Sequence, residues 1–82
     1  MEETKVYPTD EFIDANIGKT LKEIAINLED RGYNPTNQIV GYLISGDPGY
    51  ISNYKKSKNN IVKFDRTKII EVLLKEFIKW NI

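Results

Sequence analysis

Residues 32–51, GYNPTNQIVGYLISGDPGYI, decide how this chain folds. They contain two stop-and-restart signals, Gly32 before Asn34-Pro35 and Gly46 before Asp47-Pro48. In each signal, a glycine suited to ending a helix precedes a capping residue and a proline suited to a first helical turn. The stretch therefore predicts a short helix between the two signals and a single helical turn after the second.

The predicted short helix carries apolar residues in pairs four positions apart: Ile39 with Leu43, and Val40 with Ile44. Gly41 lies in its middle, where glycine costs about 1 kcal/mol of helix propensity relative to alanine. We therefore expect another helix backbone to approach closely at Gly41. On this interpretation, the short helix is the packing centre of the protein.

A longer amphipathic helix is predicted from Asp14 or Asn16 to Arg31. Its apolar residues recur at spacings of four and three, as one helical face requires: Ile17, Leu21, Ile24 and Leu28. Residues 1–13 show no helical period and contain Pro8. We expect them to form an extended, mobile arm in front of a single helical domain over residues 14–82.

The C-terminal part predicts two further helices. Residues 52–63 are polar, and Tyr54, Ile61 and Phe64 are spaced to anchor a short helix there. Asp65 is placed to cap a last helix that runs to about Trp80. The expected fold is thus all-α, a compact bundle of four to five short helices.

The last helix predicts self-association. Its apolar residues cover an arc of about 180°, wider than the ~100° stripe that one core face needs. One side would cover the helix around Ile39, and the other would contact a second copy in a twofold homodimer. The residues expected at this interface are Ile39, Leu43, Ile70, Leu74 and Phe77. The alternative is that the helix around Ile17 covers the same surface within a monomer.

The opposite side of the last helix is charged and is expected to be solvated. It carries Lys68, Glu71, Lys75 and Lys79. Glu71 and Lys75 stand in the favourable order for an ion pair within the helix, which is worth a few tenths of a kcal/mol.

The composition argues against catalysis. The chain has no histidine or cysteine, so the usual bases, nucleophiles and transition-metal ligands are missing, and we expect no enzyme activity, metal or cofactor. Acids near the first helix, Asp10, Glu11 and Asp14, are expected to oppose the helix dipole. The glycines match no phosphate-binding spacing. The absence of cysteine, of a secretory signal and of a long apolar run favours a cytoplasmic protein without membrane insertion.

One segment has a local excess of positive charge, although twelve basic and twelve acidic residues balance over the whole chain. If residues 54–66 are helical, Lys55, Lys58 and Arg66 share one side at helical spacings. This basic strip is our candidate site for an acidic partner or a phosphate, and the alternative is a solvated lysine-rich face. Helix-turn-helix DNA binding is the rival function, which the neutral chain disfavours, so no nucleic-acid partner is expected.

The pattern GYNPxNQIVGYLxSGDPxY in residues 32–50, followed by Ile69-Ile70-Glu71, resembles the IreB/ReoM family of small bacterial regulatory phosphoproteins. The resemblance covers about three quarters of the chain, from near Leu21. It implies an all-helical homodimer without enzymatic activity. It also implies phosphorylation of an N-terminal threonine by a membrane Ser/Thr kinase with PASTA domains, opposed by a cognate phosphatase.

In that family, the unphosphorylated protein promotes turnover by the Clp protease machinery of the first committed enzyme of peptidoglycan precursor synthesis. The segment Glu3-Thr4-Lys5-Val6-Tyr7 resembles the family's acid-threonine segment, so Thr4 is the expected phosphorylation site and Thr9 the second choice. The family's arginine-rich segment corresponds to residues 53–66. This chain keeps Lys58 and Arg66 there but has Asn53 and Val62 where the family pattern has arginine.

Overall fold

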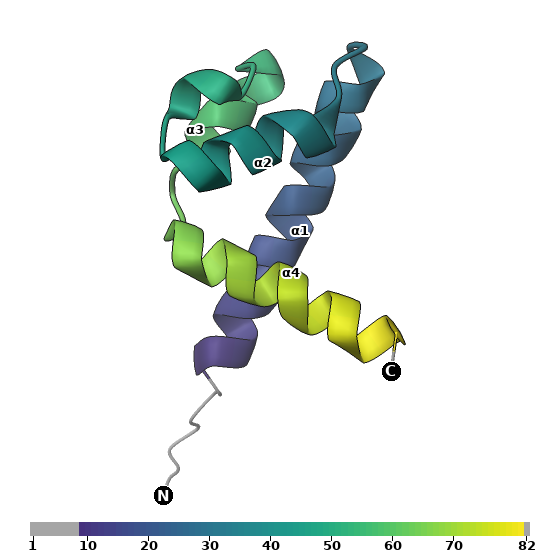
Figure 1. Cartoon of the computed structure of the whole chain (residues 1–82), viewed down its shortest axis with the longest axis vertical. Coiled ribbons are helices and arrows are strands. Elements are labelled where there is room, and N and C mark those ends of the chain that lie inside the picture. The colour runs from purple at the N-terminus through teal and green to yellow at the C-terminus, as the bar shows by residue number, and fades with distance from the viewer. Residues whose placement is uncertain (1–8, 82) are drawn as a thin grey trace, which may run out of the picture.

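The computed structural model describes residues 9–81, which form four α-helices (Figure 1). The helices are α1 (Thr9–Asp30), α2 (Pro35–Ser45), α3 (Ser57–Ile61) and α4 (Arg66–Asn81). Two 3₁₀ turns, η1 (Pro48–Tyr50) and η2 (Tyr54–Lys56), lie between α2 and α3. No strand occurs in this part of the chain, so the prediction of an all-α fold with four to five short helices is confirmed.

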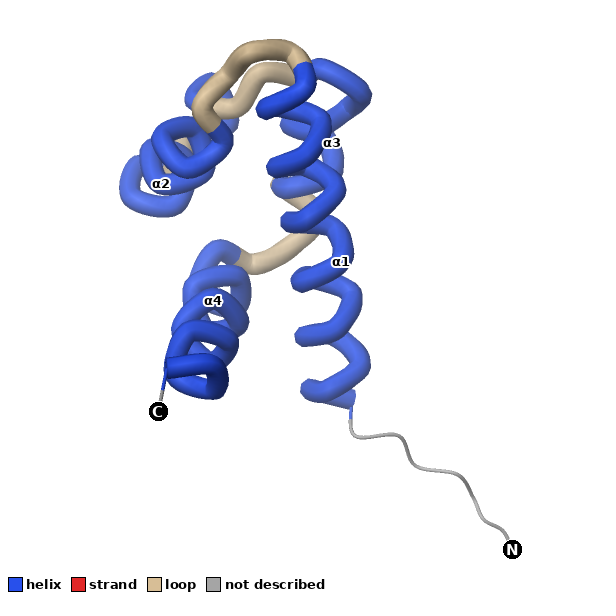
Figure 2. The backbone as a smooth tube through the Cα atoms, turned by 90° about the vertical axis from the view of Figure 1, so that its right-hand side faces the viewer, coloured by secondary structure: helices blue, strands red, loops and turns tan. Residues whose placement is uncertain are grey.

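α1 is the axis of the molecule. α2 and α3 pack against its C-terminal half, and α4 crosses its N-terminal half (Figure 1). Viewed from the side, α2 and α4 lie on the same side of α1 (Figure 2). Four residues of α1 enter the core, Ile17, Leu21, Ile24 and Leu28, and they pack with Tyr42, Ile51, Ile61, Ile69 and Val72. The packing centre is therefore α1, and not the short helix that the sequence favoured, because only α1 is long enough to contact every other helix.

α1 begins earlier than the pattern predicted. It starts at Thr9, so residues 9–13 of the expected arm belong to the helix, and residues 1–8 lie outside the described part. Ile13 explains the extension, because it lies four positions before Ile17 and packs against the core. Pro8 immediately precedes this start, a position compatible with the beginning of a helix.

Both stop-and-restart signals act as predicted. At Gly32, with φ of 90°, Tyr33 N–H donates to the Leu28 carbonyl and Gly32 N–H to the Glu29 carbonyl, which is the Schellman ending of a helix. The Asn34 side chain then caps α2 by accepting from Asn37 N–H at 3.0 Å. Capping of this kind contributes about 1 kcal/mol.

The second signal ends α2 and begins η1. Gly46, with φ of 77°, donates its N–H to the Tyr42 carbonyl at 2.7 Å. The Asp47 side chain accepts from Gly49 N–H at 2.8 Å, so it caps the single turn after Pro48. These local bonds confirm the short helix and the turn that follows it.

Gly41 serves a different purpose from the one predicted. A Cβ at this position would lie 2.5 Å from Cδ1 of Tyr50, so the glycine admits the Tyr50 ring of η1 and not a helix backbone. Gln38 holds the same region together, since its side chain accepts from Ser52 N–H at 2.8 Å and donates to Ser52 Oγ at 3.1 Å. α2, η1 and the loop after it therefore form one unit.

The apolar pairs of α2 are only partly buried. Tyr42 is its buried residue, and Ile39 and Leu43 pack against the core from the same face. Val40 and Ile44 are exposed, at 46% and 80%, which corrects their predicted place in the packing face. The reason is geometric, because positions 39, 42 and 43 share one side of a helix and positions 40 and 44 lie beyond it.

α4 covers α1 and not α2, which corrects the expected partner of this helix. It spans Arg66–Asn81, in agreement with the predicted start after Asp65 and end near Trp80. Only Ile69 and Val72 are buried along its length. The short helix expected within residues 52–63 is present as α3, which places Ile61 in the core and Phe64 beside it.

Candidate functional site

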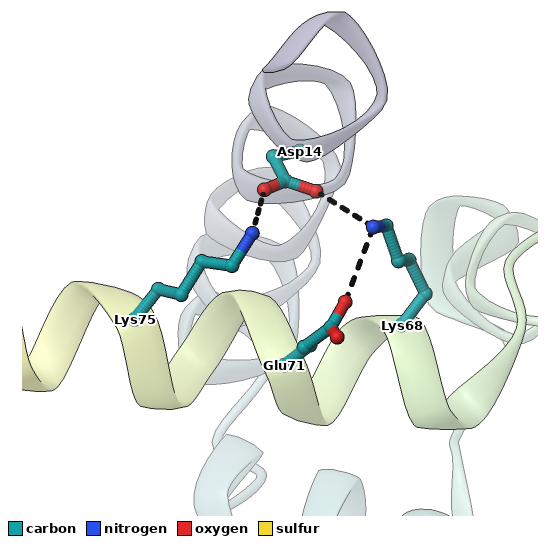
Figure 3. A network of polar contacts seen from close by, with 4 residues as sticks. All are labelled: Asp14, Lys68, Glu71 and Lys75. Atoms are coloured by element: carbon teal, nitrogen blue, oxygen red, sulfur yellow. Dashed lines mark hydrogen bonds and ion pairs between the residues drawn. The ribbon is translucent and has the colours of Figure 1, made fainter. Parts of the chain in front are cut away.

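α4 contacts α1 through two buried apolar residues, Ile69 and Val72, and through ion pairs between charged side chains. Asp14 of α1 accepts a hydrogen bond from Lys75 Nζ at 2.8 Å, and its other oxygen lies 3.6 Å from Lys68 Nζ (Figure 3). Lys68 also pairs with Glu71 at 3.1 Å. Two lysines of the charged side of α4, Lys68 and Lys75, therefore reach α1, while Glu71, Lys75 and Lys79 remain exposed as predicted. Glu71 pairs with Lys68 in place of the predicted Lys75.

This network shifts the pKa of two groups. The hydrogen bond from Lys75, together with the positive charges of Lys75 and Lys68, holds the pKa of Asp14 below its ordinary value of 3.8, although desolvation acts in the other direction. The same hydrogen bond raises the pKa of Lys75 above 10.5. Both groups thus stay charged at neutral pH. Asp14 was expected to oppose the dipole of α1, and the structure shows that it holds two helices together.

A groove of about 650 Å³ lies beside this network, between α1 and the C-terminal half of α4. Its lining includes Ala15, Gly18 and Val72, and its remaining walls are charged side chains of both helices. Space is left at Gly18, where an added Cβ would meet nothing within 4 Å. The sequence showed these charges but not that α1 and α4 bring them together, since their meeting depends on how the helices cross.

An apolar face of α4 is exposed. Of the five residues predicted at a dimer interface, Ile70, Leu74 and Phe77 lie on this face, with 47%, 57% and 63% of their surface accessible. The face is completed by three more exposed side chains: Leu73, Ile78 and Trp80. Monomeric proteins rarely leave so continuous an apolar surface uncovered.

The other two residues of that prediction are placed differently. Ile39 and Leu43 are half-buried on α2, where they pack against the core of their own chain. The exposed apolar residues of α2 are instead Val40 and Ile44. The structure therefore brings together the three α4 residues of the predicted interface and separates the two α2 residues from them.

The predicted basic strip is not formed by one continuous helix. Lys55 lies in η2, Lys58 in α3 and Arg66 at the start of α4. Lys55 and Lys56 have φ of 52° and 63°, so right-handed helical conformation is interrupted before α3. The helical spacing on which the strip depended is therefore interrupted.

Arg66 is held within the fold. Its Nη1 donates to the Leu43 carbonyl at 2.9 Å, and its guanidinium carbon lies 2.9 Å from the position that a Cβ on Gly46 would take. It thus satisfies a carbonyl left open at the end of α2. Sequence spacing does not reveal this contact, because the two residues are far apart along the chain.

A different basic cluster surrounds Tyr54. Arg31 lies 5.1 Å from the centre of the Tyr54 ring and Lys55 lies 5.6 Å from it, both within cation–π range. Arg31 was not predicted as part of a site. Its position at the end of α1 brings it to η2 only because α1 packs against that turn.

The structure describes the side chain of neither predicted phosphorylation site. Thr4 is outside the described residues, and Thr9 is the first residue of α1, with its side chain not described. Among residues 9–81, no three acidic side chains are grouped to hold a metal ion. In the same range, none of the helices combines the length and the apolar character needed to cross a bilayer.

The rival helix-turn-helix interpretation finds no support here. The helix that follows the turns after α2 is α3, and its five residues are too few to lie along a DNA groove as a recognition helix. The sequence model of the IreB regulatory phosphoprotein family, by contrast, matches residues 2–79, nearly the whole chain. Because this match covers nearly the whole of the 82 residues, the chain belongs to the IreB regulatory phosphoprotein family.

Proposed function

We propose that this protein is a cytoplasmic regulator without catalytic activity, switched by phosphorylation of Thr4, with Thr9 as the second candidate. The modifying enzyme is a membrane Ser/Thr kinase with PASTA domains, and a cognate phosphatase reverses it. The unphosphorylated form promotes turnover by the Clp machinery of the first committed enzyme of peptidoglycan precursor synthesis. The observation that carries this proposal is the family match over residues 2–79.

The proposal gives the apolar face of α4 a role in forming a homodimer. Ile70, Leu74 and Phe77 would meet the same residues of a second copy around a twofold axis. Burial of these half-exposed side chains stabilises the pair, since each fully buried apolar side chain contributes about 1.5–3 kcal/mol. The exposure of Leu74 and Phe77 in the single chain supports this assignment.

The proposal also assigns a partner-binding role to the basic residues around η2 and α3. Lys55 and Lys58 are free of ion pairs with other described residues and would contact an acidic surface of the partner. Arg31 extends this surface across the Tyr54 ring. Arg66 adds to it at the start of α4, with part of its guanidinium already bound to Leu43.

Peptide mass spectrometry of the protein from its native cells, with and without the kinase gene, tests the proposed switch. We expect one phosphate on the N-terminal peptide, located at Thr4 by fragmentation and absent without the kinase. A Thr9→Ala protein should keep the modification, and a Thr4→Ala protein should lose it. An N-terminal peptide that is unmodified in both strains would rule out the switch.

The downstream role requires a separate measurement. In cells that carry Thr4→Ala, the first committed enzyme of peptidoglycan precursor synthesis should be less abundant, and its level should recover when the Clp protease is also removed. Thr9→Ala serves as the matched control and should leave the level unchanged. Equal enzyme levels in all these strains would contradict the proposed output.

A further inference from the structure

The groove between α1 and α4 has an excess of positive charge. Each helix contributes two lysines to it, Lys19 and Lys22 from α1 and Lys75 and Lys79 from α4. Within residues 9–81, Lys19, Lys22 and Lys79 form no ion pair. Lysines that converge without a carboxylate partner are suited to an anion with several acceptor oxygens.

Two of the three acidic side chains of the groove accept a hydrogen bond. The three are Glu11, Asp14 and Glu76. Asp14 is held by Lys75 at 2.8 Å and by Lys68 at 3.6 Å, and Glu76 accepts a hydrogen bond from the Trp80 indole at 3.1 Å. Neither Glu11 nor Glu76 forms an ion pair with a described residue, so two unpaired carboxylates face the three unpaired lysines. An incoming anion would therefore meet more unpaired positive than negative charge.

The groove also lies within reach of the N-terminal segment. α1 begins at Thr9, and Asp14, which lines the groove, stands about 7.5 Å further along the helix axis. The five peptide units from Thr4 to Thr9 span up to about 17 Å when extended. A group on Thr4 can therefore reach the level of Lys75 and, with the length of a lysine side chain, that of Lys19.

We propose that this groove is the docking site of the chain's own N-terminal segment once Thr4 carries a phosphate, with Lys19, Lys75 and Lys79 holding the phosphate. The inference rests on the proposed phosphorylation of Thr4. The phosphate brings ≈ −1.5 to −2 charges and three acceptor oxygens. Glu2 and Glu3 precede it and strengthen the complementarity to the four lysines.

Docking links the modification to α4. The phosphate binds Lys75 in competition with Asp14, which is the only described residue that Lys75 otherwise binds. The ion pair between Asp14 and Lys75 therefore changes, and Lys75 belongs to the helix that carries the exposed apolar face. The phosphorylated segment also covers the lysines of the groove.

The test uses full-length protein made by semisynthesis with phosphothreonine at position 4, so that no kinase is required. Phosphorus NMR follows the second ionisation of the phosphate, whose pKa is about 6 when the group is free. We expect docking to lower this pKa by about half a unit relative to a phosphopeptide of residues 1–8. The amide of Gly18, which lines the groove, should shift in proton–nitrogen spectra upon phosphorylation.

Two charge-matched variants locate the site. Lys19→Gln with Lys79→Gln, both exposed positions, should restore the phosphate pKa to that of the peptide and abolish the Gly18 shift. Lys55→Gln with Lys58→Gln should change neither readout. Circular dichroism verifies that both variants remain folded.

A phosphate that titrates in the whole protein as it does in the peptide would overturn the inference. So would a lowered pKa that is lost with Lys55 and Lys58 instead of Lys19 and Lys79, since the segment would then dock on the other basic surface. Neither result affects the kinase-dependent modification in cells, which is measured independently. Conversely, absence of that modification in cells would contradict the proposed function, but it would not change the titration of the semisynthetic protein.

Discussion

At the scale of single residues, the motif in residues 32–50 determines local backbone conformation and packing. Asn34 caps α2, Gln38 binds the Ser52 backbone and side chain, Gly41 admits the Tyr50 ring, and Gly46 ends α2 with a positive φ. None of these residues lines the charged groove or the apolar face of α4. The motif thus specifies turns and packing, while the residues of the groove and of the apolar face lie outside it.

The two glycines Gly46 and Gly18 are predicted to respond oppositely to alanine. Gly46→Ala should lower the free energy of unfolding by about 1–2 kcal/mol, because alanine is strained at φ of 77° and its Cβ would displace the Arg66 guanidinium. Gly18→Ala should raise it by about 0.5–1 kcal/mol, because Gly18 lies within α1 and its Cβ would meet open space.

Urea denaturation of the two proteins beside the wild type measures both changes. Each variant adds the same methyl group, so the two differ in the backbone conformation and the neighbours that this group meets. A Gly46→Ala protein as stable as the wild type would contradict the assignment of Gly46 as a left-handed helix ending, and a destabilised Gly18→Ala protein would contradict the open space at Gly18.

Asp14 is predicted to give the protein an acid-dependent stability. Folding lowers the pKa of Asp14, so its contribution is present above the ordinary value of 3.8 and is lost as the pH falls through the lower folded-state value. Asp14→Asn should therefore reduce the melting temperature at neutral pH, and the difference from wild type should close below about pH 4.

Asp30→Asn is the matched control, since Asp30 is an exposed acid of α1 without an ion pair to a described residue. It should leave the melting temperature at neutral pH nearly unchanged. High salt should shrink the effect of Asp14→Asn as well, because partly exposed charges are screened. A difference between wild type and Asp14→Asn that persists unchanged to pH 2 would contradict the ion-pair explanation.

At the scale of helices, the sequence predicted what depends on neighbouring residues and missed what depends on helix crossing. The C-terminal ends of α1 and α2 and the caps of α2 and η1 follow from bonds between residues at most five positions apart, and all were predicted. The periodicity of residues 17–28 likewise identified the buried face of α1. Local chemistry is sufficient for these features.

The placement of α4 could not be read from its own pattern. Its wide apolar arc indicated two partners, but the width of the arc does not determine which side of the helix packs against the rest of the chain. The structure places Ile69 and Val72 inside, with Lys68 and Lys75 reaching Asp14, so the apolar arc is turned outward. The groove and its lysines follow from this crossing, which is why the sequence did not reveal them.

At the scale of the whole molecule, the outward apolar face predicts a stability that depends on protein concentration. A dimer gains stability by mass action, so its melting temperature rises with concentration. Leu74→Glu should abolish this dependence, because Leu74 is 57% exposed in the single chain and a charge there opposes only the contact with a second copy. Thr36→Glu, at an exposed polar position of α2, makes the same change in charge and should preserve the dependence.

Sedimentation equilibrium of the unmodified protein tests the central claim most directly, namely that this short chain completes its fold as a pair through α4. We expect a species of twice the 9.5 kDa of one chain for the wild type and for Thr36→Glu, and a single folded chain for Leu74→Glu. A wild-type protein that remains a single chain at the highest concentrations would contradict the claim.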